Sequence, residues 1–190
     1  LDDQYSHSPL ASKSNMAIHL IWGNDSASIE GSINKLIEEF VDPIWSTLNL
    51  SRHDGSDPNQ ATKALKELQT PPLGNGDRLV LIQKSPFCNG CSSEMANQFE
   101  KAIEIIPDQC HLVLSNTNKP DGRLKTTKTL QKLIKDGKAN EISFLLPAPW
   151  DTEGQRKLVE KSANNLKIKI EPKAIDCLVD AIGSDSTRLL

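Results

Sequence analysis

The ordered pattern of this chain begins with a strand, a glycine and a helix, but no phosphate-binding loop joins them. Residues 16–22 are typical of a buried strand, and residues 29–40 have the periodicity of a helix. In nucleotide-hydrolysing α/β domains this junction carries G-x-x-x-x-G-K-[ST], whose lysine reaches the phosphates and whose hydroxyl binds magnesium. No lysine stands in the turn after Gly23, and Asp25 and Glu30 would repel a triphosphate. We therefore predict the architecture of a nucleotide hydrolase without its chemistry, and expect a binding function.

Strand and helix patterns alternate along the chain as far as residue 147. Turn residues such as glycine and proline separate them at nearly every junction. This alternation predicts an α/β domain with a parallel five-stranded sheet and flanking helices over residues 16–147. The expected strands are residues 16–22, 45–50, 78–82, 110–114 and 142–146, and the expected helices are residues 29–40, 58–69, 92–106 and 122–135.

The two ends of the chain differ from this domain. Pro147 and Pro149 form a stiff linker, and residues 148–190 are predicted to form a small, incomplete helical lid domain. Its helices are expected at residues 151–166, at 172–182 and, as a first turn only, at 186–190. Because that turn has nothing to pack on, we expect the sequence to be part of a longer protein. Residues 1–15 have no periodicity and are expected to be a disordered leader or a non-native remnant.

Composition limits the classes of partner and compartment. A net charge of −3 gives no overall field toward nucleic acid, so any DNA contact must come from a local patch. No apolar run approaches the roughly 18–20 residues of a membrane span, so no membrane partner is expected. The start of the chain lacks the features of a signal peptide, and four cysteines without such a signal favour a reducing compartment. The expected location is the cytoplasm.

Five stretches in a fixed order carry a family resemblance. They are IWGND at 21–25, NLSRHDG at 49–55, TPPLG at 70–74, DGRLK at 121–125 and AIGSD at 181–185. With the inactive phosphate loop, the proline hinge and the helical lid, they resemble the delta subunit of the bacterial DNA polymerase III clamp loader. The stretch SPFCNGC at 85–91 is similar to the cyanobacterial branch of that family.

The resemblance covers residues 16–190 and implies a fold, a role and partners. The fold would be AAA+-like (RecA-like), and no cofactor is implied. The role would be non-hydrolytic: the subunit would bind and open the beta sliding clamp during DNA replication. It would have no catalysis of its own, and would serve the polymerase holoenzyme by association. Other loader subunits would join through a C-terminal collar domain that this sequence does not contain.

The segment after the second expected helix is the predicted clamp-binding loop. Its residues Pro71, Pro72, Leu73 and Gly74 are expected to project from the edge of the domain, with prolines restricting the backbone. In the resembling family an apolar pair at this place inserts into a pocket of the clamp, and by position that pair is Pro72 and Leu73. This sequence has leucine at 73 where the family frequently has phenylalanine. The alternative is that Leu73 packs against its own helix.

A basic helix supplies a second candidate interface. Arg123 stands just before it, and four lysines at spacings of three and four residues form one stripe along it. They are Lys125, Lys128, Lys132 and Lys135. The stripe is either a solvated outer face or a weak contact with DNA or an acidic partner.

Cys88 and Cys91 form a C-x-x-C pair that supports a different class of function. Placed before a helix, such a pair resembles the site of a thiol-disulfide oxidoreductase, which needs a lowered thiol pKa. It is also a weak candidate for a metal site, with Cys110 and His111 as further ligands. The third alternative is two thiols in a capping loop. A thiol oxidoreductase or a diverged nucleotide-binding protein is therefore the alternative to a clamp-loader subunit.

Overall fold

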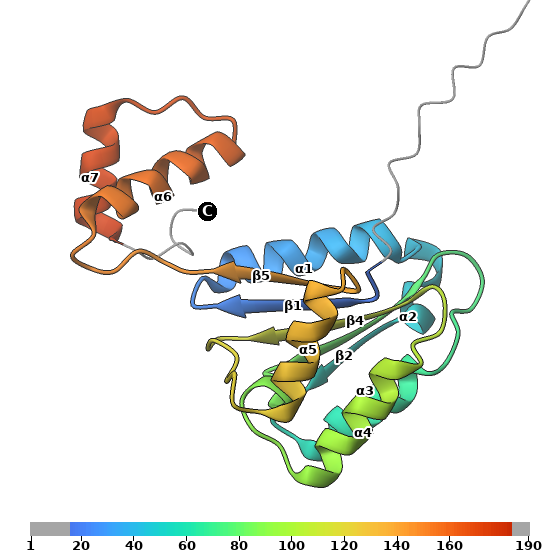
Figure 1. Cartoon of the computed structure of the whole chain (residues 1–190). Coiled ribbons are helices and arrows are strands. Elements are labelled where there is room, and N and C mark those ends of the chain that lie inside the picture. Colours follow the sequence, from blue (N-terminus) through green and yellow to red (C-terminus); the bar gives the residue numbers. More distant parts are fainter. Residues whose placement is uncertain (1–15, 184–190) are drawn as a thin grey trace, which may run out of the picture.

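A parallel sheet of five strands forms the centre of the protein (Figure 1). The computed structural model describes residues 16–183. The strands lie in the order β2-β3-β4-β1-β5, and each adjacent pair is parallel, which confirms the predicted fold class. Their bounds are β1 Ile18–Gly23, β2 Leu50–Asp54, β3 Arg78–Gln83, β4 Cys110–Asn116 and β5 Ala139–Phe144.

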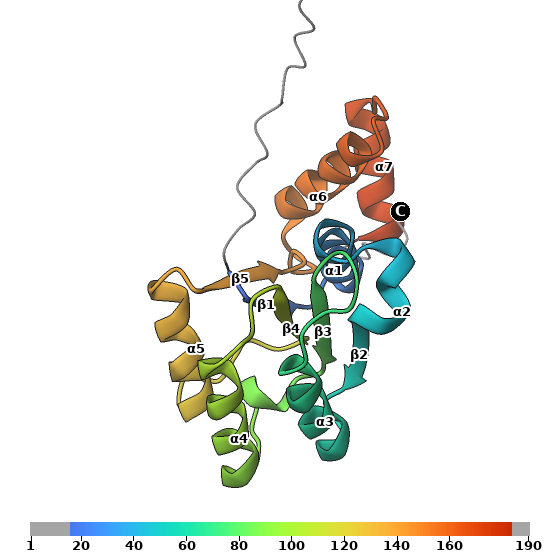
Figure 2. The ribbon, with the colours of Figure 1, turned by 90° about the vertical axis from the view of Figure 1, so that its right-hand side faces the viewer.

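Helices cover both faces of the sheet, because a parallel sheet is stable only when both faces are removed from water. Helices α3, α4 and α5 pack on one face and α1 packs on the other (Figure 2). The helices of this domain are α1 Ser26–Phe40, α2 Ser46–Asn49, α3 Pro58–Leu68, α4 Ser93–Glu104 and α5 Lys125–Lys135, and the two 3-10 turns are η1 Pro43–Trp45 and η2 Pro86–Cys88.

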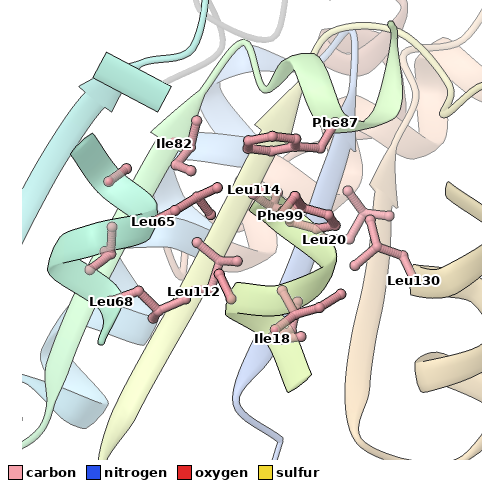
Figure 3. Packing of buried hydrophobic residues seen from close by; sticks show 14 of the residues in the cluster. Ile18, Leu20, Leu65, Leu68, Ile82, Phe87, Phe99, Leu112, Leu114 and Leu130 are labelled. Carbon is pink, nitrogen blue, oxygen red and sulfur yellow. The ribbon is translucent and has the colours of Figure 1, made fainter. Parts of the chain in front are cut away.

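The larger hydrophobic core lies between the sheet and α3, α4 and α5 (Figure 3). Val80 and Ile82 of β3 belong to this core, whereas Leu79 and Leu81 belong to the smaller core under α1. Successive side chains of a strand point to opposite faces, so one apolar run fills both cores. This arrangement explains why β3 has a continuous apolar sequence instead of an alternating one.

The prediction of a strand at residues 45–50 is wrong. The turn η1 and helix α2 occupy this segment, and β2 begins only at Leu50. Asp42 accepts a hydrogen bond from the backbone N–H of Ile44 (2.8 Å), and Pro43 stands in the first turn, a pattern that starts a helical segment. β2 was missed because it is an edge strand with a largely polar sequence and lacks the apolar run of a central strand.

Most other elements differ from their predicted bounds by one to three residues, and α1, β5 and α5 each begin three residues away from their predicted start. β5, at the opposite edge of the sheet, covers Ala139–Phe144 instead of residues 142–146, and it too has a half-exposed sequence. α5 begins at Lys125 instead of residue 122, because Asp121 accepts hydrogen bonds from the backbone and guanidinium of Arg123 and forms a turn there.

Beyond β5 and the linker, two helices, α6 (Thr152–Asn165) and α7 (Pro172–Ile182), occupy the segment predicted to be the lid (Figure 1). They pack on each other through Val159, Ile175 and Val179. The predictions for residues 1–15 and 186–190 lie outside the described residues. Among the helices of residues 16–183, none has the length and apolar character needed to span a membrane.

A histidine cluster lies within the smaller core. His19 of β1 is 2% exposed and lies near the rings of Phe40 and His111, with centroid distances of 5.8 and 5.9 Å. The ring of His111 stacks on Phe40 at 3.8 Å, and its Nε2 lies 3.1 Å from a carboxylate oxygen of Asp77. Burial, with a smaller effect of the neighbouring His111, lowers the pKa of His19 from 6.5 to about 4.

This shift predicts that acid destabilises the protein through His19. Between pH 6.5 and about 4 the unfolded chain binds a proton at this residue that the folded chain does not, so stability falls as the pH falls. Between pH 7 and pH 5 the loss from His19 alone should be about 2 kcal/mol. Urea unfolding at both pH values should show a smaller loss in His19→Leu than in the wild type. An equal loss in both proteins would assign the pH dependence to other groups.

Candidate functional site

The junction between β1 and α1 has a carboxylate at the place where a phosphate would bind. Gly23 has φ +145°, and a Cβ at this position would lie 1.8 Å from the carbonyl oxygen of Phe144 in β5. At the start of α1, the carboxylate of Asp25 accepts hydrogen bonds from the backbone N–H of Ser28 (3.0 Å) and from its hydroxyl (2.6 Å). A helix N-terminus that could bind a phosphate is therefore already occupied by a negative charge.

The same junction is tied to the start of the linker. The backbone N–H of Asp25 donates to the carbonyl of Phe144 (3.2 Å), and the side-chain oxygen of Asn24 accepts from the backbone N–H of Leu146 (2.7 Å). The turn after β1 thus binds the segment by which β5 leaves the sheet.

The loop between α3 and β3 lies beside α2 and is held there by one side chain (Figures 1 and 2). Asn49, the last residue of α2, is fully buried. Its amide nitrogen donates to the carbonyl of Leu73 (2.8 Å), and its amide oxygen accepts from the backbone N–H of Leu73 (2.9 Å). Both backbone groups of Leu73 are satisfied, so the loop is fixed at its tip.

A second contact fixes the next residue of the loop. Gly74 has φ +70°, and a Cβ at this position would lie 2.1 Å from Cε2 of Trp45. The loop backbone therefore lies directly on the indole ring, which only glycine allows.

The two ends of the loop are held as well. The carbonyls of Thr70 and Pro71 accept from the thiol of Cys110 (3.5 Å) and from the guanidinium of Arg78 (3.4 Å). At the other end, the backbone N–H of Asp77 donates to the carbonyl of Phe40 (2.7 Å). The loop is thus ordered throughout by contacts with the domain.

The order of the loop backbone contrasts with the exposure of its apolar tip. The side chain of Leu73 is 52% exposed, Pro71 is exposed, and Pro72 is half-buried. Leu73 does not bury its side chain on α3, although its backbone is fully bonded. The structure therefore presents an aliphatic side chain to solvent from a rigid support.

Two further exposed apolar residues lie beside the loop, and sequence reasoning missed both. Ile44 is 86% exposed and Leu48 is 50% exposed. They adjoin Trp45 and Asn49, the two residues that contact the loop, and their spacing of four places them on one face of the helical segment. We call Ile44, Leu48 and Leu73 the apolar patch. The Asp42-Pro43 pair was the sequence signal that could have revealed the helical segment.

The five basic residues of the second candidate interface fall into two groups, two that form ion pairs in the described part of the chain and three that do not. Arg123 pairs with Asp121 (2.7 Å), and this guanidinium lowers the pKa of the Asp121 carboxyl to about 2. Lys125 pairs with Glu100 of α4. The remaining three residues are exposed on α5, and within residues 16–183 no carboxylate lies in ion-pair range of them. They are Lys128, Lys132 and Lys135.

The Cys88–Cys91 segment is built into the fold. Cys88 is fully buried, and its carbonyl accepts from the backbone N–H of Asp121 (2.8 Å). Burial raises the pKa of the Cys88 thiol to about 12, and burial also raises the pKa of Cys91. A redox thiol needs the opposite shift, so this environment opposes oxidoreductase chemistry.

The wider set of metal ligands is not brought together. Cys110 belongs to the core under α3 and α4, whereas the neighbouring His111 contacts Asp77 and Phe40 on the other face. Throughout the part of the chain that the structure describes, no group of three or more His, Cys, Asp or Glu side chains could hold a metal ion.

Comparison with known proteins now decides the family. A family model described as the delta subunit of DNA polymerase III matches residues 19–143. The chain belongs to the DNA polymerase III delta subunit family. No curated protein sequence matches the chain.

Two solved structures are similar to this chain. The DNA clamp loader delta protein of Bacillus subtilis is 19% identical, with a TM-score of 0.72 over 91% of this chain and 50% of that protein. At this identity the similarity establishes the fold, and the chain spans about half the length of that relative. A gamma subunit-related protein of DNA polymerase III from Thermotoga maritima is also 19% identical, with a TM-score of 0.44 over 81% of this chain and 48% of that protein.

The packing of Gly74 on Trp45 predicts a strong effect of a single methyl group. Gly74→Ala should destabilise the protein by about 1–3 kcal/mol, because alanine is strained at a positive φ and its Cβ would overlap the indole ring. Gly31→Ala is the control, since a Cβ at this exposed position of α1 meets nothing within 4 Å. Urea unfolding should show no loss for this control. Equal stability of the two variants would contradict the proposed contact.

Proposed function

We propose that this delta-family chain binds the beta sliding clamp through residues 70–74 and opens the ring without hydrolysing ATP. The observation that carries this proposal is the half-exposed Leu73 on a backbone fixed by Asn49. An apolar side chain that is exposed yet rigidly held loses little conformational entropy when a partner covers it. Such a residue is suited to act as an anchor in an apolar pocket.

The state of the β1–α1 junction supports the non-hydrolytic part of the proposal. Asp25 caps α1, and the backbone of β5 fills the space next to Gly23. A loader subunit of this kind would rely on other loader subunits for hydrolysis and would join them through its collar domain. With four cysteines in the chain and each of them a free thiol, we place this assembly in the cytoplasm.

The alternative function, that of a thiol oxidoreductase, has less support than clamp binding. It needs a reactive thiolate, whereas burial raises the pKa of both Cys88 and Cys91. Nucleotide binding also has less support, because the carboxylate of Asp25 caps the helix N-terminus where a phosphate would bind.

Truncation of Leu73 tests the clamp contact. Leu73→Ala should weaken binding to the clamp by about 1–3 kcal/mol, a factor of roughly 5–150 in Kd, and should leave the melting temperature nearly unchanged. Surface plasmon resonance with the immobilised clamp of the same organism measures Kd. The control is Ile105→Ala at the end of α4, where the side chain is 71% exposed. A loss of stability with unchanged Kd would show that Leu73 serves the fold instead.

Three exposed lysines of α5, which have no ion-pair partner among residues 16–183, support a weak contact with DNA within the loader complex. Lys128, Lys132 and Lys135 should neutralise about three phosphates, which predicts a log–log slope of Kobs against salt near −3 on duplex DNA. Replacing all three by glutamine should flatten this slope in a fluorescence anisotropy titration. The matched control is Lys125→Gln, which removes a lysine already paired with Glu100. Binding that does not change with salt would mean that the lysines are only a solvated surface.

A further inference from the structure

The segment before β2 has an inverted distribution of polar and apolar side chains. Asp42, Ser46 and Asn49 bond to the backbone: Asp42 to the N–H of Ile44, Ser46 to the carbonyl of Pro43 (2.9 Å), and Asn49 to Leu73. The apolar Ile44 and Leu48 point outward into solvent instead. Exposed Ile44 and Leu48 contribute little to the stability of the fold, because aliphatic side chains stabilise a protein when they are buried.

The outward residues stand next in sequence to the two residues that hold the proposed anchor. Ile44 adjoins Trp45, on which Gly74 lies, and Leu48 adjoins Asn49, which holds the backbone of Leu73. The two segments therefore form one rigid support, although residues 49 and 73 are far apart in the sequence. A partner surface of ordinary interface size that covers Leu73 would therefore also reach Ile44 and Leu48.

We propose that the 43–49 segment is a second anchor for the same partner, so that the clamp is held by the whole apolar patch of Ile44, Leu48 and Leu73. This proposal rests on the proposed function and names further residues for it. The partner surface would carry an apolar depression that accommodates several aliphatic side chains. A single half-exposed leucine offers only a small apolar contact, and the two flanking side chains supply the additional apolar area.

The pattern also assigns a positioning role to Asn49. It is fully buried and cannot touch the partner, but it fixes Leu73 relative to Leu48. Its two hydrogen bonds hold the 43–49 segment and the loop that carries Leu73 in a fixed relative position.

The experiment compares variants of the full-length chain for binding to the clamp of the same organism. Ile44→Ser/Leu48→Ser should raise Kd by roughly tenfold or more, while the melting temperature stays unchanged because both side chains are exposed. Ile105→Ser is the matched control, an exposed aliphatic residue outside the patch, and should leave Kd unchanged.

The outcomes separate this inference from the proposed function. If Leu73→Ala weakens binding and the double serine variant does not, the second anchor is refuted and the Leu73 contact stands. If the wild-type chain does not bind the clamp, the proposed function itself fails. If sedimentation shows that the wild type self-associates and the serine variant does not, the patch binds a second copy and the inference is overturned. A lower melting temperature of the serine variant, with unchanged Kd, would assign the patch to packing within the full-length chain and would also overturn it.

Discussion

The burial of β3 and β4 on both faces is the constraint on which the rest of this structure depends. Every residue of β4 is buried, and Leu79 to Ile82 of β3 are inaccessible to solvent. Two such strands require helices on both sides, so the sheet meets solvent only at its strand ends and its edges. The carboxyl end of β1 meets the capped N-terminus of α1, and the loop from α3 enters the sheet at the amino end of β3. The apolar patch lies beside this second point.

Polar side chains in this protein mainly position the backbone. Asn49 bonds to Leu73, Asp25 to Ser28 and Asp42 to Ile44, and each bond satisfies a backbone group that would otherwise lack a partner. The buried thiol of Cys88 belongs to the same construction, since its segment connects the end of β3 with the start of α5. The burial of Cys88 favours two thiols in a capping loop, one of the three alternatives that the sequence left open for the C-x-x-C pair.

The sequence predicted the central part of the fold better than its edges. The strand at 78–82 was found because burial on both faces demands an uninterrupted apolar run, and α3 because Asp57-Pro58 starts it. β2 and β5 lie at the sheet edges, where solvent on one side permits polar residues and removes that signal. The exposed tip of the loop was expected from its two prolines. The support from Asn49 could not be, because no local pattern indicates a contact between residues so far apart in the chain, and the wrong strand at 45–50 concealed Ile44 and Leu48.

The hydrogen bonds between the turn after β1 and the end of β5 affect how movement could pass from one to the other. In nucleotide switches, loops that are held by the terminal phosphate and its Mg²⁺ rearrange when that phosphate is lost. Here the turn after β1 is held by the chain itself. Asn24 accepts a hydrogen bond from Leu146, and the backbone N–H of Asp25 donates to Phe144. Hydrogen bonds within the chain therefore set the direction in which the linker leaves the sheet toward α6. A change at the turn after β1 would be passed to the linker through these two contacts, without a bound ligand between them.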